Sequence, residues 1–116
     1  MTNYKTGDIL LLPFPFTDLS SSKKRPALVL STILSKKLPA IYIVAMITSQ
    51  IGSENILGDI QPLSWKEAGL LHESKIRLGK LVSVEKSIID KKLGQLTAKD
   101  ILLVKKEFKK TFQALL

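Results

Sequence analysis

Three short apolar runs in the first half of the chain limit the folds that it can adopt. They span residues 8–14, 26–31 and 41–47, with glycine, proline or polar residues close to each end. Runs this short are typical of buried strands, because most helices are longer. The run at 41–47 is apolar at successive positions, so both of its faces are expected to be covered, as in a central strand. The first half of the chain is therefore predicted to be β structure.

Glycine and proline continue to divide the chain into short segments between residues 52 and 96. Alternation around Gly79 predicts a bent strand, because glycine within a strand often marks a bulge. The stretch PLSWKEAG favours a single helical turn, which Ser64 could cap and Gly69 could end. The expected elements are a turn at 52–55, a strand at 56–60, the helical turn at 62–69, the bent strand at 75–84 and a brief strand at 93–96.

The hydrophobic pattern changes to a helical period after residue 96. Thr97 and Asp100 resemble a capping box with aspartate in place of the usual glutamate. Apolar residues then recur at steps of three and four, which predicts a helix over about 97–115 with one face packed on a core or a dimer partner. These residues are Ile101, Val104, Phe108, Phe112 and Leu115. We therefore expect one domain over residues 1–116, a small, mainly β barrel with one C-terminal helix.

The composition excludes several kinds of catalytic site. The chain has no cysteine, which removes disulfides, thiolate nucleophiles and metal clusters built on sulfur. Its only histidine is His72, so one subunit has no histidine pair, and we expect this side chain to be exposed. The six glycines are scattered singly, so no phosphate-binding P-loop is present. An enzyme built from this chain would have to work without a metal ion, a thiol or a histidine pair.

Basic residues exceed acidic ones, with 18 Lys and Arg against 10 Asp and Glu and a formal net charge of +8. Such an excess attracts polyanions, of which nucleic acid is the commonest inside cells. The plainer alternative is that lysines on the solvated face of the C-terminal helix keep the protein soluble. Prolines interrupt the apolar N-terminus, and no later run approaches the roughly 20 residues that a membrane span needs. We expect a cytoplasmic protein that binds no membrane.

Arg25 stands at the junction between a basic loop and an apolar strand. The stretch SSSKK precedes it, and Pro26 restricts the backbone where the strand begins. A guanidinium held in this way suits a phosphate, because its planar fork matches two phosphate oxygens. RNA supplies its own nucleophile, the 2′-hydroxyl, so an enzyme needs only to orient that group, stabilise charge on the phosphate and assist the proton. RNA cleavage is the reaction that these constraints favour.

Four stretches of the sequence form a pattern that extends over nearly the whole chain. They are GDILLLPFPFTDLSSSKKRPALVLS at 7–31, AMITSQ at 45–50, GLLHES at 69–74 and KKLGQLTAKDILLV at 91–104. In this order they resemble the PemK/MazF family of toxin endoribonucleases. The Gly-Asp start, followed by Arg-Pro and a strand, is the most specific part of the resemblance.

The resemblance implies a small SH3-like barrel of the PemK/MazF type, usually a homodimer with a basic groove near the dimer interface. Family members cut single-stranded RNA, typically mRNA, without a metal ion or cofactor, and leave a 2′,3′-cyclic phosphate and a 5′-hydroxyl. The resemblance also implies a type II toxin–antitoxin system, in which a cognate antitoxin protein blocks the groove. Operator DNA is expected to bind only through the complex with the antitoxin.

The family's catalytic arginine and threonine map onto Arg25 and Thr48. Because arginine keeps its proton near neutral pH, we assign it to phosphate binding and charge stabilisation, with proton donation to the leaving oxygen as a further role. Thr48 would orient the 2′-hydroxyl or relay its proton, and its plainer role is that of a turn hydroxyl bonded to the backbone. Further candidate RNA-binding residues are Asp18, Lys23, Lys24, Ser49, Gln50 and Ser74.

Several of these candidates have plainer interpretations as well. Lys23 and Lys24 could form an ordinary solvated hairpin tip, and Asp18 could make an Asx-turn. Ser49 and Gln50 could simply shape a loop. For Trp65, the only tryptophan, core filling is favoured over base stacking.

The chain departs from the commonest family pattern in two places. Lys24 stands where many relatives have glycine, and Lys80, Leu81 and Val82 stand where they have Gln-Ile-Arg. Because that arginine is missing, the family's RNA contacts and base preference do not carry over directly. Two alternatives to an endoribonuclease stay open: a toxin that acts by protein contact, like the gyrase-directed relatives, and an inactive RNA-binding barrel.

Overall fold

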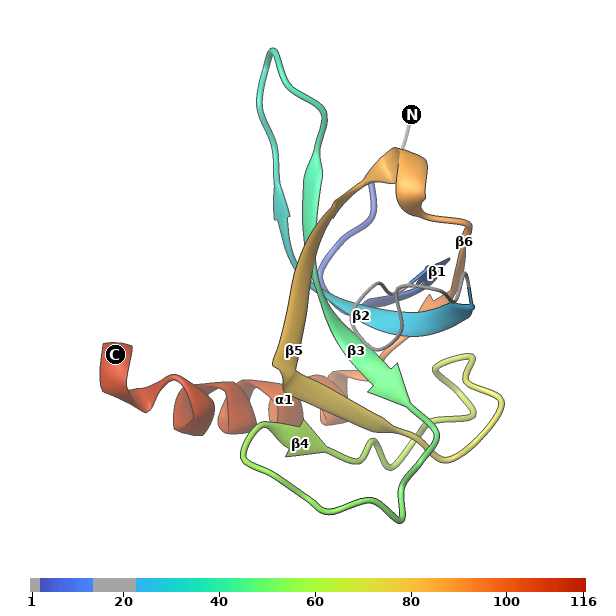
Figure 1. Ribbon diagram of the computed structural model, residues 1–116, viewed down its shortest axis with the longest axis vertical. Coiled ribbons are helices and arrows are strands. Elements are labelled where there is room, and N and C mark those ends of the chain that lie inside the picture. The colour runs from blue at the N-terminus through green and yellow to red at the C-terminus, as the bar shows by residue number, and fades with distance from the viewer. Residues whose placement is uncertain (1–2, 14–22) are drawn as a thin grey trace.

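The computed structural model describes residues 3–13 and 23–116, which form one antiparallel sheet and one α-helix (Figure 1). The six strands lie in the order β4-β5-β3-β2-β1-β6. Their bounds are Asp8–Pro13 (β1), Lys24–Ile33 (β2), Ile41–Thr48 (β3), Asp59–Ile60 (β4), Lys75–Glu85 (β5) and Lys91–Gln95 (β6). The prediction of a mainly β fold with one C-terminal helix is confirmed, although the strand expected at 56–60 is reduced to two residues.

Apolar residues cover both faces of the central strands, because successive side chains of a strand point to opposite faces. One buried cluster contains Ile9, Leu28, Ala45 and Ile47, together with residues of the helix and of the segment before β5. The other contains Leu10, Ala27, Val44 and Met46. The prediction that 41–47 forms a central strand is therefore confirmed, since β3 lies between β2 and β5 and is apolar on both sides.

Strand β5 bends where the sequence predicted it. Its pairing with β3 shifts between Ala45, whose partner is Leu81, and Met46, whose partner is Arg77. The residues between these two partners, 78–80, include Gly79 and form a bulge, which bends the strand and redirects the side chains around it. The bulge contributes Lys80 to the site described below, which Arg25 of β2 also lines.

The segment 62–69 forms turns that include the predicted single helical turn, but no hydrogen bond of the Ser64 hydroxyl caps it among the described residues. One backbone hydrogen bond has α-helical spacing, from Ala68 N to Ser64 O, and a bond from Leu70 N to Trp65 O closes the turn around Gly69. Gly69 ends the segment with a φ of +91°, and a Cβ there would collide with the carbonyl of Leu93. Glycine is required because only glycine adopts this conformation freely and lets β6 approach so closely.

Helix α1 spans Ala98–Thr111 and begins as predicted, with the Thr97 hydroxyl accepting a hydrogen bond from Asp100 N at 3.3 Å. The Asp100 carboxylate does not complete the expected capping box. It accepts hydrogen bonds from Leu63 N and Ser64 N, at 3.1 and 2.9 Å, and is 1% exposed. One aspartate therefore joins the start of α1 to the segment 62–69.

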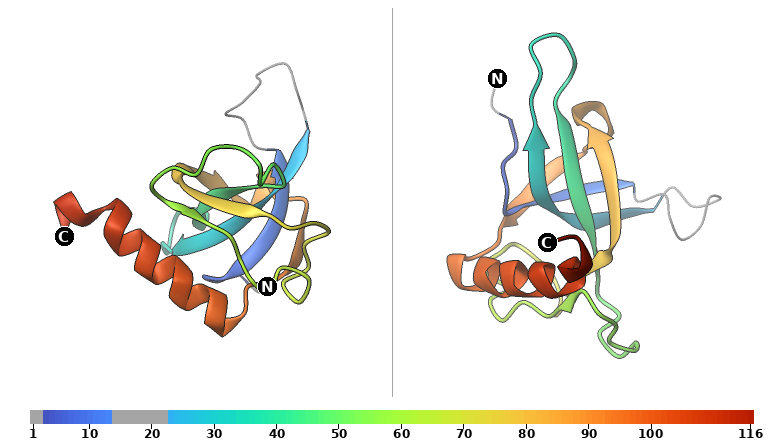
Figure 2. Two further views of the ribbon diagram at one scale, coloured as in Figure 1. Left: turned by 90° about the horizontal axis from the view of Figure 1, so that it is seen from below. Right: turned by 90° about the vertical axis from the view of Figure 1, so that its left-hand side faces the viewer.

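The apolar stripe of α1 is covered over only part of its length. Val104 is buried, but Phe108 is 38% exposed and Leu115 is 86% exposed. The α-helix ends at Thr111, earlier than predicted, and a short 3-10 turn over Gln113–Leu115 follows it. The cause is visible in Figure 2, where the C-terminal end of α1 extends beyond the sheet.

Candidate active site

The antiparallel register of β2 and β3 places Arg25 and Thr48 across from each other. Ala27 is the partner of Met46, and the same register continued by two residues sets Arg25 opposite Thr48. Residues two apart in a strand share a face, so all four side chains point to the same side. Opposite residues in such a pair have Cβ atoms about 4.5–5.5 Å apart.

Arg25 and Thr48 line a single cavity of about 270 Å³. Its other lining residues are Met46, Gln50, Ser53, Arg77 and Lys80. Among the described residues that line it, three are cationic and none is acidic. The cavity therefore has the charge and the polar hydrogen-bond donors to bind an anion such as a phosphodiester.

Arg25 is half-buried as the second residue of β2, opposite the buried Leu12 of β1. Pairing with β1 fixes its backbone, while its side chain reaches the cavity. In the part of the chain that the structure describes, its guanidinium has no ion pair or hydrogen bond. All five N–H groups of this side chain are thus available for a bound anion.

Thr48 is the last residue of β3 and is 6% exposed. Its hydroxyl oxygen accepts a hydrogen bond from Gln50 N at 3.2 Å, which is the plainer role that the sequence left open. A hydroxyl has one donor and two acceptor positions, so this bond leaves its hydrogen and a second lone pair for a ligand. The backbone contact orients the hydroxyl in the cavity without using up its hydrogen-bonding capacity.

Arg77 lies in the cavity wall as part of a buried ionic cluster. Its Nε is 3.5 Å from Asp59 Oδ1, and Lys75 Nζ is 3.9 Å from Asp59 Oδ2. The same two cations reach the loop after β3, where Lys75 Nζ donates to Ser53 O at 2.9 Å and an Arg77 terminal nitrogen donates to Glu54 O at 3.1 Å. The cluster therefore fixes the cavity wall that Ser53 contributes, and Asp59 offsets much of the charge of Arg77.

Lys80 is half-buried in the β5 bulge and lines the same cavity. Within the described ranges its ammonium group has no ion pair, so its charge is available to a ligand. The sequence identified Lys80 only as a departure from the family pattern, and it did not identify Arg77 or Ser53. The departure at Val82 has a structural explanation, because this residue packs against an apolar cluster where an arginine would carry a charge.

The residues predicted to bind RNA are not all brought to this cavity. Gln50 lines it, whereas Ser49 lines a neighbouring cavity. Lys24 pairs with Asp90 at 3.2 Å, Lys23 is exposed, and the buried Ser74 donates its hydroxyl hydrogen to His72 O at 2.8 Å. Asp18 lies outside the described residues. For these residues, RNA binding stays a prediction.

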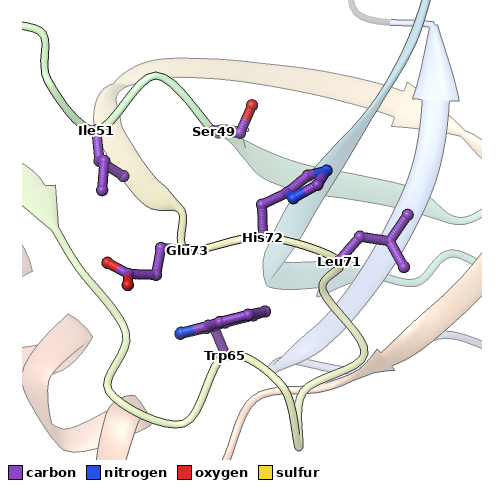
Figure 3. Close-up of a pocket in the computed structure, with 6 residues that line it drawn as sticks. All are labelled: Ser49, Ile51, Trp65, Leu71, His72 and Glu73. Carbon is purple, nitrogen blue, oxygen red and sulfur yellow. The ribbon is translucent and has the colours of Figure 1, made fainter.

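The neighbouring cavity has a volume of about 590 Å³ and is open to solvent. Figure 3 shows its lining residues Ser49, Ile51, Trp65, Leu71, His72 and Glu73. Trp65 is half-buried and packs against the first apolar cluster, as the predicted core filling requires. The prediction is confirmed only in part, because the same side chain also lines this cavity. His72 is exposed, as predicted.

No three His, Asp or Glu side chains of residues 3–13 and 23–116 are arranged to hold a metal ion. Over the same residues, no helix has the length and apolar character needed to cross a bilayer.

Comparison with known proteins links this architecture to one family. Residues 5–112 match the family described as PemK-like, MazF-like toxin of type II toxin–antitoxin system. No curated protein sequence matches the chain.

Three solved structures resemble the chain in fold. A mycobacterial endoribonuclease in complex with its cognate antitoxin has a TM-score of 0.74 at 11% identity, over 96% of each chain. A second mycobacterial endoribonuclease has a TM-score of 0.71 at 13% identity, over 97% of this chain and 94% of that one. The MazE–MazF complex of Deinococcus radiodurans has a TM-score of 0.64 at 16% identity, over 95% of each chain. The six-stranded antiparallel sheet with a C-terminal helix is thus a MazF-like fold.

Proposed function

Because the chain belongs to the family of PemK-like, MazF-like toxins of type II toxin–antitoxin systems, we propose that it is an endoribonuclease that cleaves single-stranded RNA, typically mRNA, without a metal ion. The observation that carries this proposal is the cavity in which Arg25 and Thr48 meet beside Lys80. A toxin that acted by protein contact alone would need no such group of cations around a hydroxyl.

The scissile phosphate would bind in this cavity with its non-bridging oxygens on the Arg25 guanidinium. The bidentate fork then stabilises the charge that develops on these oxygens as the 2′-oxygen attacks phosphorus. Thr48, oriented by Gln50 N, would accept a hydrogen bond from the 2′-hydroxyl and hold its oxygen in line for attack.

The reaction moves one proton overall, from the 2′-oxygen to the departing 5′-oxygen. The new bond joins the 2′-oxygen to phosphorus, and the bond from phosphorus to the 5′-oxygen breaks. The Thr48 hydroxyl would pass the 2′ proton to water, Lys80 would protonate the 5′-oxygen, and water would return a proton to Lys80. We assign the donor role to Lys80 because an ammonium gives up a proton more readily than a guanidinium. The products are a 2′,3′-cyclic phosphate and a 5′-hydroxyl.

The family also supports a proposal about partners. We propose a homodimer that is inhibited by a cognate antitoxin protein, with operator DNA bound only through that complex. The net charge of +8 favours an acidic segment of the antitoxin over the cationic cavity. The substrate, mRNA, places this activity in the cytoplasm.

The direct test is to incubate the purified chain with end-labelled RNA in excess EDTA and to identify the product ends. We expect cleavage to survive EDTA, with 2′,3′-cyclic phosphate and 5′-hydroxyl termini, because the nucleophile and the charge-stabilising groups belong to the RNA and to the chain. A strict need for Mg²⁺, or 5′-phosphate products, would contradict the mechanism. The absence of cleavage in both conditions would contradict the enzyme assignment.

A further inference from the structure

We propose that the open cavity around Trp65 binds one unpaired base of the RNA, with guanine preferred, next to the cavity that holds the scissile phosphate. The inference rests on the proposed function, because it assigns a second part of the same substrate. It gives a role to Ser49, Trp65, His72 and Glu73, which the cleavage mechanism does not use.

The two cavities lie on either side of one short segment of chain. Thr48 and Gln50 line the phosphate cavity, and Ser49 between them lines the other. Residues 48, 49 and 50 follow one another in the chain, with consecutive Cα atoms about 3.8 Å apart. An RNA strand with its phosphate against Arg25 would therefore only need to cross the segment 48–50 to place a base beside Trp65.

Trp65 provides a fixed aromatic surface for that base. Its ring packs against the first apolar cluster on one side of the molecule and lines the cavity with the rest of its surface. In Figure 3 the ring lies across the cavity from Ser49 and His72. Lys66 Nζ lies over the ring, 5.4 Å from its centroid, and this exposed, flexible side chain would have to move aside for a base to stack on that face. Stacking on aromatic side chains is a common way for proteins to bind single-stranded RNA.

Glu73 indicates which base fits best. Its carboxylate accepts a hydrogen bond from the Gln61 side chain at 3.4 Å and still has free acceptor positions. A carboxylate repels phosphate but accepts hydrogen bonds from base N–H groups, and guanine presents two such groups on one edge. Ser74 follows Glu73 and is buried. Its hydroxyl donates a hydrogen bond to His72 O, and this bond fixes the backbone that carries the exposed side chains of His72 and Glu73.

A protein segment is the competing occupant, since Leu71 at the rim is exposed and apolar. We favour RNA for two reasons. The cavity borders the segment 48–50, which also borders the phosphate cavity, and its polar groups Ser49, His72 and Glu73 match the edge of a base better than an aliphatic side chain.

Trp65 is the only tryptophan, so its fluorescence reports directly on this cavity. The test titrates the protein with short RNAs that are 2′-O-methylated throughout, so that they cannot be cleaved, and that differ only in one central base. We expect saturable quenching, strongest with guanine and weakest with uracil.

The affinity of the variants is measured by the anisotropy of labelled RNA. Trp65→Leu should weaken binding about tenfold while keeping apolar packing, and Glu73→Gln should reduce the preference for guanine. Ile88→Ala, on a separate exposed surface, is the matched control and should bind as the parent does.

Binding of RNA with unchanged Trp65 fluorescence and unchanged affinity of the Trp65→Leu variant would overturn the proposal. So would quenching by the cognate antitoxin protein but not by RNA, which would assign the cavity to a protein. Thermal melting of Trp65→Leu shows whether that variant is folded. If it is unfolded, quenching of Trp65 fluorescence in the parent protein by RNA still tests whether a base binds in this cavity. Failure of the proposed function is separate, because it would appear as quenching by RNA without cleavage of unmethylated RNA.

Discussion

Arg25 is the residue on which the proposed chemistry depends most. It combines a backbone paired with β1 and a guanidinium that has no partner among the described residues. Evolutionary resemblance and cavity geometry indicate the same residue by independent routes, since one concerns sequence order and the other the position of its side chain.

Replacing Arg25 by alanine should lower the rate of RNA cleavage by about 10²-fold or more while leaving the protein folded, because it removes a charge-stabilising donor from the transition state. Arg25→Lys should also be slow, because the two-pronged contact is lost. Single-turnover cleavage and thermal melting measure both effects. Lys109→Ala is the control, since Lys109 is exposed on α1 and does not line the cavity, and equal losses in both variants would argue against a specific role for Arg25.

Thr48 allows a second test at the residue level. Thr48→Val keeps the shape of the side chain but removes the hydroxyl, and we expect cleavage to fall by about 10-fold or more, within the range of positioning and proton-transfer effects. Thr48→Ser keeps the hydroxyl and its bond with Gln50 N, so it should keep most of the activity. Activity of the valine variant equal to that of the serine variant would show that the hydroxyl acts only as a turn contact.

At the scale of the elements, Asp100 joins helix α1 to the segment that carries Trp65. Its buried carboxylate accepts hydrogen bonds from Leu63 N and Ser64 N, and its own backbone N–H donates to Thr97. The position of the segment 62–69 is therefore determined by a contact with a residue more than thirty positions away.

Asp100→Ala should lower the free energy of unfolding by about 1–3 kcal/mol, because two buried N–H groups lose their acceptor. Asp100→Asn, which keeps one acceptor oxygen, should lose less. Chemical denaturation measures both values. Asp90→Ala is the comparison, since an exposed aspartate in a surface ion pair should change stability by about 0–1 kcal/mol. If the two alanine variants lost equal stability, the contact between α1 and the segment 62–69 would not be the stabilising one.

At the scale of the whole molecule, the net charge of +8 includes Arg25 and Lys80, which line the cavity with no carboxylate among its described lining residues. Many other lysines lie on the exposed surface of α1, away from this site. Net charge thus favours polyanions in general, whereas the proposed phosphate site depends on the position of Arg25 and Lys80.

The affinity for uncleavable single-stranded RNA should fall as salt rises, because bound phosphates release counterions. Lys80→Ala should reduce the slope of log affinity against log salt by about 0.7, the value for one phosphate contact on a single strand. Lys109→Ala, on the helix surface, should leave the slope nearly unchanged. Binding isotherms at several salt concentrations measure the slopes, and identical slopes for Lys80→Ala and the parent protein would remove Lys80 from the RNA path.

Local sequence patterns determined most of the elements of this protein. The apolar runs at 8–14, 26–31 and 41–47, the change of period after residue 96 and the Thr97 cap all correspond to observed elements. These features depend on residues close together in the chain, where spacing and side-chain chemistry decide the local conformation. The same local logic identified Arg25 at the start of a strand.

Tertiary structure decided which side chains share a site. The β5 bulge brings Lys80 to the cavity of Arg25, and the ion pair with Asp59 holds Arg77 in the wall of the same cavity, beside Ser53. All three of these lining residues are far from Arg25 in sequence. Strand register, a bulge and a buried charge cluster result from pairing between distant segments, so a short window of sequence does not contain them. The chain itself specified the arginine, and only the folded sheet gave it the surroundings for chemistry on a phosphate.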